Sequence, residues 1–279
     1  MNSDKRIAQR MALGEESQRS WQEPRATAPL GHLIGASQAM QSIFSRVGRV
    51  ASSNSTVLIT GESGTGKEAI ARAIHEQGVR AARPFISINC AAMTDGFLES
   101  ELFGHLKGSK SGAIEGREGR FLAGHRGTVF LDEVGKMGKR LQARLLRFLE
   151  DGEVRAIGSS QTEKVDVRVV AATRSNLRRA VREGSFRQDL YYRLSVIPIG
   201  IPPLRERRDD IEPLARHFVV RHGGGDRQID ASALRMLASQ LWIGNARELE
   251  NVIERSLTLC EGERLTDEDL IFEEKPSDL

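Results

Sequence analysis

The sequence has very little cysteine: Cys90 and Cys260 are the only two among 279 residues. Two cysteines are too few for a disulfide framework or a cysteine-rich metal site, so a reducing compartment is the default expectation. Apolar runs long enough to span a membrane are also missing, and the N-terminus has no apolar signal core. We therefore expect a soluble, cytoplasmic protein without a membrane partner.

A strong charge of one sign is missing as well. The formal net charge is only +3, with lysine and arginine dispersed along the chain, so bulk charge does not indicate nucleic-acid binding. Internal repeats and low-complexity tracts are absent too. What the chain does have is an ordinary hydrophobic share of 39%, which is enough for a sizeable core.

Five apolar runs alternate with helical patterns in the first two thirds of the chain, which predicts an α/β fold with a parallel sheet covered on both faces. These runs are 56–60, 85–88, 128–131, 165–172 and 195–199. Beyond Pro202 and Pro203 three amphipathic helices are expected, at 208–222, 230–240 and 245–259, with Asp230 as the N-cap of the second. The predicted organisation is a polar tail (1–29), an α/β nucleotide-binding subdomain (30–203), an all-α helical lid (204–260) and an acidic tail (261–279).

A glycine-rich loop follows the first strand run and precedes a helical pattern. Strand, glycine loop, lysine and helix together predict a triphosphate cradle, in which backbone N–H groups surround the phosphates and the lysine reaches the β and γ oxygens. Glutamate takes the last position, where Ser or Thr usually helps to hold magnesium. The loop residues are Gly61, Glu62, Ser63, Gly64, Thr65, Gly66, Lys67 and Glu68.

Two adjacent carboxylates, Asp132 and Glu133, end another apolar run. Successive strand residues point to opposite faces, so the two side chains cannot share one task. Asp132 is the better magnesium partner, and Glu133 is placed to polarise an attacking water. Loop and carboxylates together predict a site for ATP and Mg²⁺.

Several further segments carry a family resemblance: 101–105 (ELFGH), 152–158 (GEVRAIG), 168–173 (RVVAAT) and 242–251 (WIGNARELEN). Over residues 31–272 the chain resembles the central AAA+ domain of bacterial enhancer-binding proteins, ATPases that activate the sigma-54 form of RNA polymerase. The resemblance implies an AAA+ α/β core with a helical lid. It also implies a ring, most often a hexamer, as the working form.

The resemblance assigns roles to single residues. It implies that the segment 33–37 packs near the adenine, that Thr173 probes the γ-phosphate and that Arg247 faces the nucleotide. It implies that Asn89 restrains the catalytic glutamate, although the residue type suits a strand-end turn equally well. Arg174 follows Thr173, where relatives usually carry Asn or His.

The segment 186–193 (FRQDLYYR) matches the part of these ATPases that carries arginine fingers, which act in the neighbouring subunit's site. The resemblance implies this role for Arg187 and Arg193. Their spacing of six residues corresponds to about 240° on an ideal helix, so geometry alone does not bring both to one phosphate.

The loop expected to contact sigma-54 departs from the family. Relatives carry GAFTGA, whose Phe and Thr touch the sigma factor, whereas this chain has Gly108, Ser109, Lys110, Ser111, Gly112 and Ala113. A solvated ammonium does not replace the apolar area that an aromatic ring buries. The ATPase is expected to work, while the partner contact is expected to be altered.

The leading hypothesis is therefore a ring ATPase that remodels the sigma-54 RNA polymerase holoenzyme. A related ring ATPase with another protein partner, and a small-molecule kinase built on the same phosphate loop, are the alternatives. A sensing domain before residue 30 and a helix-turn-helix after residue 272 are not found. DNA would thus be reached only through a domain outside this chain or through a partner protein.

Overall fold

The computed structural model describes residues 33–106, 116–225, 227–260, 262 and 264–272, all within the unit His32–Leu279. The predicted tail 1–29, the loop 108–113 and part of the acidic segment 261–279 lie outside the described residues.

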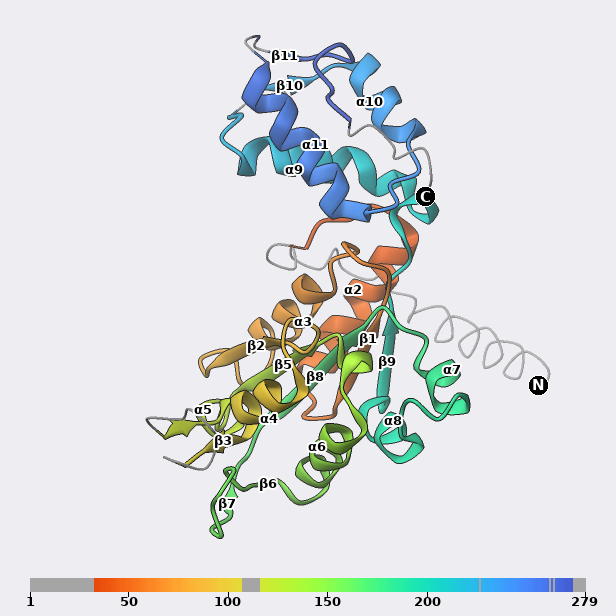
Figure 1. Cartoon of the computed structure of the whole chain (residues 1–279). Coiled ribbons are helices and arrows are strands. Elements are labelled where there is room, and N and C mark those ends of the chain that lie inside the picture. Colours follow the sequence, from red (N-terminus) through yellow and green to blue (C-terminus); the bar gives the residue numbers. More distant parts are fainter. Residues whose placement is uncertain (1–32, 107–115, 226, 261, 263, 273–279) are drawn as a thin grey trace, which may run out of the picture. The chain divides into compact units, whose positions relative to one another are not determined.

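Five parallel strands form the central sheet, in the order β2-β5-β8-β1-β9 (Figure 1). The predicted α/β class is therefore confirmed. In this register Asn89 lies opposite Asp132, and Thr60 lies opposite Thr173. Polar residues from four strands thus meet at the carboxyl edge of the sheet. The strands are β1 (Val57–Thr60), β2 (Phe85–Asn89), β5 (Thr128–Asp132), β8 (Arg168–Thr173) and β9 (Ile197–Gly200).

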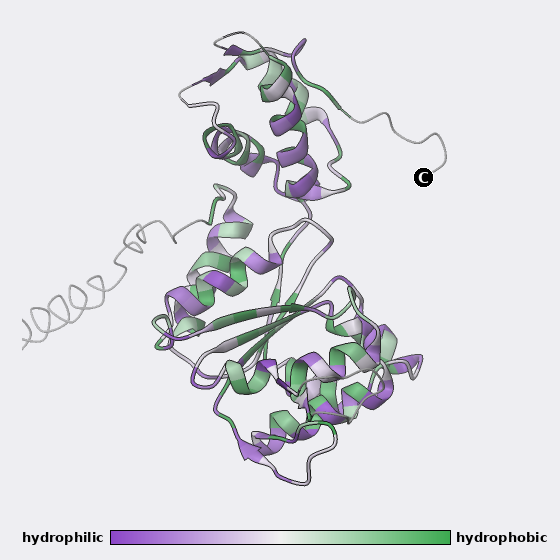
Figure 2. Ribbon diagram, turned by 60° about the vertical axis from the view of Figure 1, so that its left-hand side comes forward, coloured by the Kyte–Doolittle hydropathy of each residue, from purple (hydrophilic) through white to green (hydrophobic). Residues whose placement is uncertain are grey.

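Helices pack on both faces of this sheet, which explains the apolar runs without alternation (Figure 2). On β8, Val169 and Ala171 belong to the core formed with α4, α6 and α8, while α3 packs on β1, β5 and β8. All six residues of β8 are buried. The helices of this part are α2 (Gln38–Ala51), α3 (Lys67–Glu76), α4 (Asp95–Phe103), α5 (Arg120–Ala123), α6 (Lys139–Asp151), α7 (Leu177–Arg182) and α8 (Gln188–Leu194).

Strand β8 begins three residues later than the sequence pattern predicts. The backbone N–H of Val165 donates to Gly152 O, and Asp166 O accepts from the N–H of Arg126, so this stretch bonds to loops. Arg168 then opens the strand with a buried guanidinium that donates to the carbonyls of Val50 and Ala51 at the end of α2. Two short antiparallel pairs flank the sheet: β3 (Gly104–His105) with β4 (Arg117–Glu118), and β6 (Glu153–Val154) with β7 (Glu163–Lys164).

A second hydrophobic core begins at Leu204 and includes Leu237, Trp242 and Leu249. Trp242 is almost fully buried, and its Nε1–H donates to Leu237 O at 2.8 Å. Three helices and a short parallel strand pair surround this core, in agreement with the predicted helical region. They are α9 (Ile211–Arg221), α10 (Ala231–Ser239), α11 (Asn245–Leu259), β10 (Gln228–Ile229) and β11 (Arg264–Leu265).

The first of these helices starts at Ile211, after the 3₁₀ turns η2 (Leu204–Glu206) and η3 (Arg208–Asp210). Asp230 occupies the N-cap position of α10 in extended geometry, but its side chain makes no capping hydrogen bond. Within the described ranges, no helix combines the length and apolar character needed to cross a membrane. The boundary between 203 and 204 stays a prediction.

Candidate functional site

The glycine loop connects β1 to α3 at the carboxyl edge of the sheet. Gly64 and Gly66 have φ angles of +76° and +97°, which side-chain-bearing residues adopt at a cost. A Cβ on Gly64 would also lie 2.1 Å from Gly244 O. Thr65 Oγ1 donates to Glu62 O at 2.8 Å and closes the loop. The glycines are therefore required by the shape of the loop.

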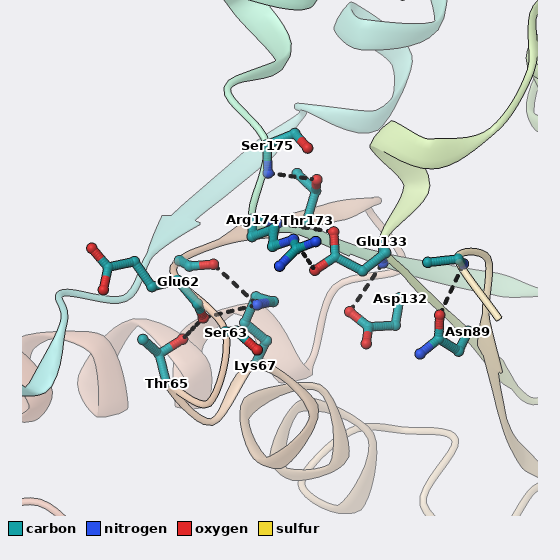
Figure 3. Close-up of polar contacts among 12 residues, drawn as sticks. Glu62, Ser63, Thr65, Lys67, Asn89, Asp132, Glu133, Thr173, Arg174 and Ser175 are labelled. Carbon is teal, nitrogen blue, oxygen red and sulfur yellow. Dashed lines mark hydrogen bonds and ion pairs between the residues drawn. The ribbon is translucent and has the colours of Figure 1, made fainter. Parts of the chain in front are cut away.

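Lys67 begins α3, and its side chain folds back over the loop (Figure 3). Its Nζ donates to Gly61 O and to Glu62 O, each at 3.0 Å. Burial lowers the pKa of this ammonium, and the nearby Glu133 and Asp132 carboxylates oppose that shift. The cation lies beside the loop amides and the N-terminus of α3, an arrangement suited to phosphate.

Asp132 is the last residue of β5, and its Oδ1 accepts the N–H of Glu133 at 3.0 Å. Burial raises the pKa of Asp132, while Lys67 lowers it. Glu133 has left the strand, with φ of +57° and ψ of +43°, ahead of the 3₁₀ turn η1 (Val134–Lys136). Because Glu133 lies beyond the strand, its direction is set by this left-handed conformation and not by strand alternation, and both carboxylates line one cleft. Such a conformation in a non-glycine residue is uncommon and is concentrated at functional sites.

Thr173 ends β8 and is fully buried, and its Oγ1 accepts the N–H of Ser175 at 3.0 Å. The next residue, Arg174, lines the cleft and reaches Glu133 (Figure 3). Sequence reasoning noted Arg174 only as a departure from the family. Its contact with a carboxylate 41 residues away has no local sequence signal.

Asn89 ends β2 and also lines the cleft. Its Oδ1 accepts the N–H of Ala91 at 2.9 Å, which is the turn role that the residue type suggests. The structure has no hydrogen bond between Asn89 and Glu133, although both lie in its described part. Its role as a restraint on the glutamate stays a prediction.

The helical region contributes residues to the same loop. Arg247 Nη1 donates to Ser63 Oγ at 3.2 Å, and Asn245 Nδ2 donates to Ser63 O at 2.9 Å. The backbone N–H of Ala246 donates to Gly64 O at 3.0 Å. Arg247 was predicted to face the site. Asn245 was not predicted to contribute to the site. The structure shows that it is fully buried and has a φ of +57°.

Two arginines after the sheet also bind the loop. Arg205 forms a bidentate ion pair with Glu62, with N···O distances of 2.6 and 2.7 Å. This pair lowers the pKa of Glu62 to about 2. Arg207 is buried and donates to Thr65 O at 2.9 Å. Every contact named here joins segments about 140 residues apart, so sequence patterns do not predict them.

These groups surround a cleft of about 720 Å³. Its lining includes loop residues 63–66, Lys67, Asp132, Glu133 and Arg247, together with the apolar residues Leu33, Ile34, Met40, Leu214 and Phe218. The cleft lining thus combines charged and apolar side chains. Within the described residues, no cluster of three or more His, Cys, Asp or Glu side chains could hold a metal ion on its own.

The two predicted finger arginines lie elsewhere. Arg187 precedes α8 and pairs with Asp189 at 2.6 Å, while Arg193 donates twice to Leu149 O, at 2.7 and 3.1 Å. Neither is among the described residues that line the cleft of its own chain. The predicted partner loop, 108–113, lies outside the described residues.

A parallel sheet with a glycine phosphate loop, two carboxylates at the next strand end and a helical cap define a P-loop nucleotide-binding protein of the AAA+ class. The chain belongs to the sigma-54 interaction domain family, whose model matches residues 33–200, and an AAA+ ATPase lid domain follows at residues 205–277.

Curated relatives include a Nif-specific regulatory protein of Bradyrhizobium diazoefficiens, 53% identical over 233 residues, which are 82% of this chain and 40% of that protein. The transcriptional regulatory protein ZraR of Klebsiella oxytoca is 48% identical over 242 residues, 85% of this chain and 55% of ZraR. The chain thus spans about half the length of the curated relatives it matches.

Among solved structures, NtrX from Brucella abortus in complex with ADP has a TM-score of 0.78 at 35% identity, covering 99% of this chain and 61% of NtrX. NtrX in complex with ATP has a TM-score of 0.77 at 37% identity, covering 95% of this chain and 62% of NtrX. A RuvB variant from Thermotoga maritima, at 17% identity and a TM-score of 0.56, shares the fold alone.

Proposed function

We propose that the chain binds ATP with magnesium in this cleft and hydrolyses it, and that a ring of such chains uses the turnover to remodel sigma-54 RNA polymerase. The observation that carries the proposal is the convergence of Lys67, Asp132 and Glu133 on one cleft in a member of this family. The nucleotides in the NtrX complexes support the choice of ligand.

In this proposal the loop N–H groups and the N-terminus of α3 hold the phosphates, and the apolar side chains of the cleft pack against the adenine. Lys67 exchanges its two carbonyl acceptors for phosphate oxygens. Leu33 and Ile34, which line the cleft, support the expectation that segment 33–37 packs near the base. Arg247 faces the phosphates from α11.

The donor chemistry of the cleft fits magnesium, which is held in such sites by one or two carboxylates together with phosphates and water. Asp132 would supply the carboxylate, since its Oδ1 accepts the N–H of Glu133 and its Oδ2 accepts no hydrogen bond from the described residues. Glu68 also lines the cleft, although it pairs with Arg72 at 2.8 Å. When bound, the metal would neutralise charge on the phosphates.

Glu133 accepts a proton from a water molecule as that water attacks the γ-phosphorus and the bond to the β–γ bridging oxygen breaks. ADP and phosphate are the products. Arg187 and Arg193 would complete the site from the neighbouring subunit, because neither reaches the cleft of its own chain. This arrangement supports a ring, most often a hexamer in the family.

The partner is proposed from family membership, and loop 108–113 is proposed as its contact. We propose the cytoplasm as its location, because a bacterial polymerase partner works there. DNA would be reached through a further domain or a partner protein. The second candidate, a ring ATPase with another protein target, is favoured only by Lys110 and Ser111 in that loop.

The experiment measures ATP binding and hydrolysis in the parent and in Lys67→Ala and Glu133→Ala. Lys67→Ala is expected to abolish binding, because each charge-assisted hydrogen bond contributes about 1.5–3 kcal/mol. Glu133→Ala is expected to bind ATP but to lose turnover by about 10²–10⁴-fold, because it removes a group needed only for the chemical step.

Lys139→Ala serves as the matched control, since Lys139 is exposed at the start of α6. It should hydrolyse ATP like the parent. Parent rates in both Lys67→Ala and Glu133→Ala would overturn the assignment.

A further inference from the structure

The Glu133 carboxylate is held by Arg174 in this structure. Its Oε2 accepts the backbone N–H of Arg174 at 3.3 Å, and its Oε1 lies 3.8 Å from Arg174 Nε (Figure 3). Asn89, the residue expected to restrain this glutamate, bonds instead to its own turn. The hydrogen bond and the ion pair of the Glu133 carboxylate therefore both come from Arg174, which follows β8.

Arg174 follows the end of β8, between the strands that lead into the other charged groups of the cleft. Strand β8 lies between β5, which carries Asp132, and β1, which leads into the glycine loop. The side chain of Arg174 lines the same cleft as Lys67 and Arg247 and is 56% exposed, so its guanidinium has room to turn. Arg174 also contributes to the lowered pKa of Lys67, which places the two cations within electrostatic range of one another.

The bond between the guanidinium and Glu133 is weak. At 3.8 Å the two atoms form an ion pair without hydrogen-bond geometry, and solvent weakens the pair on the side of Arg174, whose side chain is 56% exposed against 14% for Glu133. A terminal phosphate presents several charged oxygens, which a planar guanidinium binds in a bidentate manner. ATP would therefore compete successfully with Glu133 for Arg174, whereas ADP lacks the competing group.

We propose that Arg174 is a charge switch for Glu133, holding the carboxylate in the absence of ATP and releasing it when the γ-phosphate takes the guanidinium. Arg174 is thereby a γ-phosphate ligand and a positioning residue for Glu133. The inference rests on the proposed function, because it requires ATP to bind in this cleft. It makes the switch depend on the arginine that stands in place of the usual Asn or His.

The first test compares dissociation constants of ADP and of a non-hydrolysable ATP analogue. Arg174→Asn should weaken binding of the ATP analogue by about 10-fold or more while changing ADP binding little, because only ATP has the group that Arg174 binds. Arg174→Lys keeps the charge without the planar fork and should show a smaller loss. Arg216→Asn is the control, since Arg216 pairs with Glu212 on an exposed face of α9.

The second test is a double-mutant cycle with Glu133→Gln. This change frees Arg174 from its carboxylate and should tighten binding of the ATP analogue. In the Arg174→Asn background the tightening should be several-fold smaller, since no guanidinium is left to release. A purely structural role for Arg174 would alter ADP and ATP binding together and would leave the Glu133→Gln effect unchanged.

The outcomes separate the two proposals. A parent chain that binds neither nucleotide contradicts the proposed function and the switch together. A parent that binds both, with an ATP-to-ADP preference unaltered by Arg174→Asn and Arg174→Lys, overturns the switch alone. Equal effects of Glu133→Gln in both backgrounds would overturn it as well.

Discussion

Asp210 is a fully buried carboxylate that joins three parts of the chain. It accepts hydrogen bonds from the N–H groups of Ala36 and Ser37, each at 2.6 Å, and from Ser37 Oγ at 2.9 Å. Arg207 Nη1 lies 3.6 Å from its Oδ2, while Arg207 Nη2 donates to Thr65 O. The two side chains thus link the segment before α2, the phosphate loop and the start of α9.

Removing this carboxylate should be costly. Asp210→Ala leaves the guanidinium of Arg207 buried without a counter-charge, and breaking a buried pair typically lowers the free energy of unfolding by about 3–5 kcal/mol. The neighbouring Asp209 is exposed, so Asp209→Ala should change it by less than about 0.5 kcal/mol. Urea unfolding of the three proteins measures both values, and equal stability of the two variants would contradict the assignment.

The sequence predicts some site residues and not others. Phosphate and magnesium binding require short sequence patterns, a glycine loop after a strand and carboxylates at a strand end, and these patterns predicted Lys67, Asp132 and Glu133. The structure brings all three to one cleft. Arg207 and Asp210 lie in the charged stretch 205–210 (RERRDD), which gives no local sign of burial. Their burial depends on Ser37 and Thr65, which are more than 140 residues away, and no local pattern encodes such a contact.

The three central strands β5, β8 and β1 were predicted well because each is an apolar run that is almost wholly buried, whereas the edge strands β2 and β9 are only partly buried. Their ends were less well predicted. Strand β8 starts late because Val165 and Asp166 form their backbone hydrogen bonds with loops. Helix α9 also starts late: Asp210, which ends the 3₁₀ turn before it, accepts hydrogen bonds from the N–H groups of Ala36 and Ser37. Tertiary contacts therefore decide where regular structure begins.

The loop 108–113 should determine partner contact without affecting ATP chemistry. None of the proposed ATP-site residues lies in the loop. The charge of Lys110, in contrast, would have to be buried without a partner in an apolar interface, which weakens binding. We expect weak or absent sigma-54 binding by the parent and a gain in binding and promoter opening by Lys110→Phe plus Ser111→Thr. The assays are sigma-54 binding with a transition-state nucleotide analogue, promoter opening and ATP turnover.

Unchanged ATP turnover in the double variant is the internal control for that experiment. Full sigma-54 activity already present in the parent would show that the aliphatic stem of Lys110 and the flanking glycines suffice for contact. Continued absence of binding in the double variant would favour another protein target.

Assembly should govern hydrolysis, because the proposed fingers lie outside the cleft of their own chain. Specific activity is expected to rise with protein concentration. Mixing Arg193→Ala chains with Glu133→Ala chains should restore part of the turnover, since an intact cleft of one variant can meet an intact finger of the other. Turnover by a strict monomer, independent of concentration, would rule out this arrangement.

A mixture of Arg193→Ala with Arg187→Ala is the matched control for complementation. Every interface in that mixture lacks one of the two arginines, so no activity should return. Recovery in the control would mean that a single finger is enough and that the mixing result does not locate the site between chains.

The hydrogen bonds from α11 to the glycine loop have a consequence for local opening. Ala246 N–H and Asn245 Nδ2 bond to the carbonyls of Gly64 and Ser63, and Gly64 has no room for a Cβ beneath Gly244. An opening that exposes the first turn of α11 must break the same bonds that shape the loop, so the two segments unfold as one cooperative unit. Amide hydrogens at the start of α11 and in the loop therefore share a common protection free energy, although about 180 residues separate them in the chain.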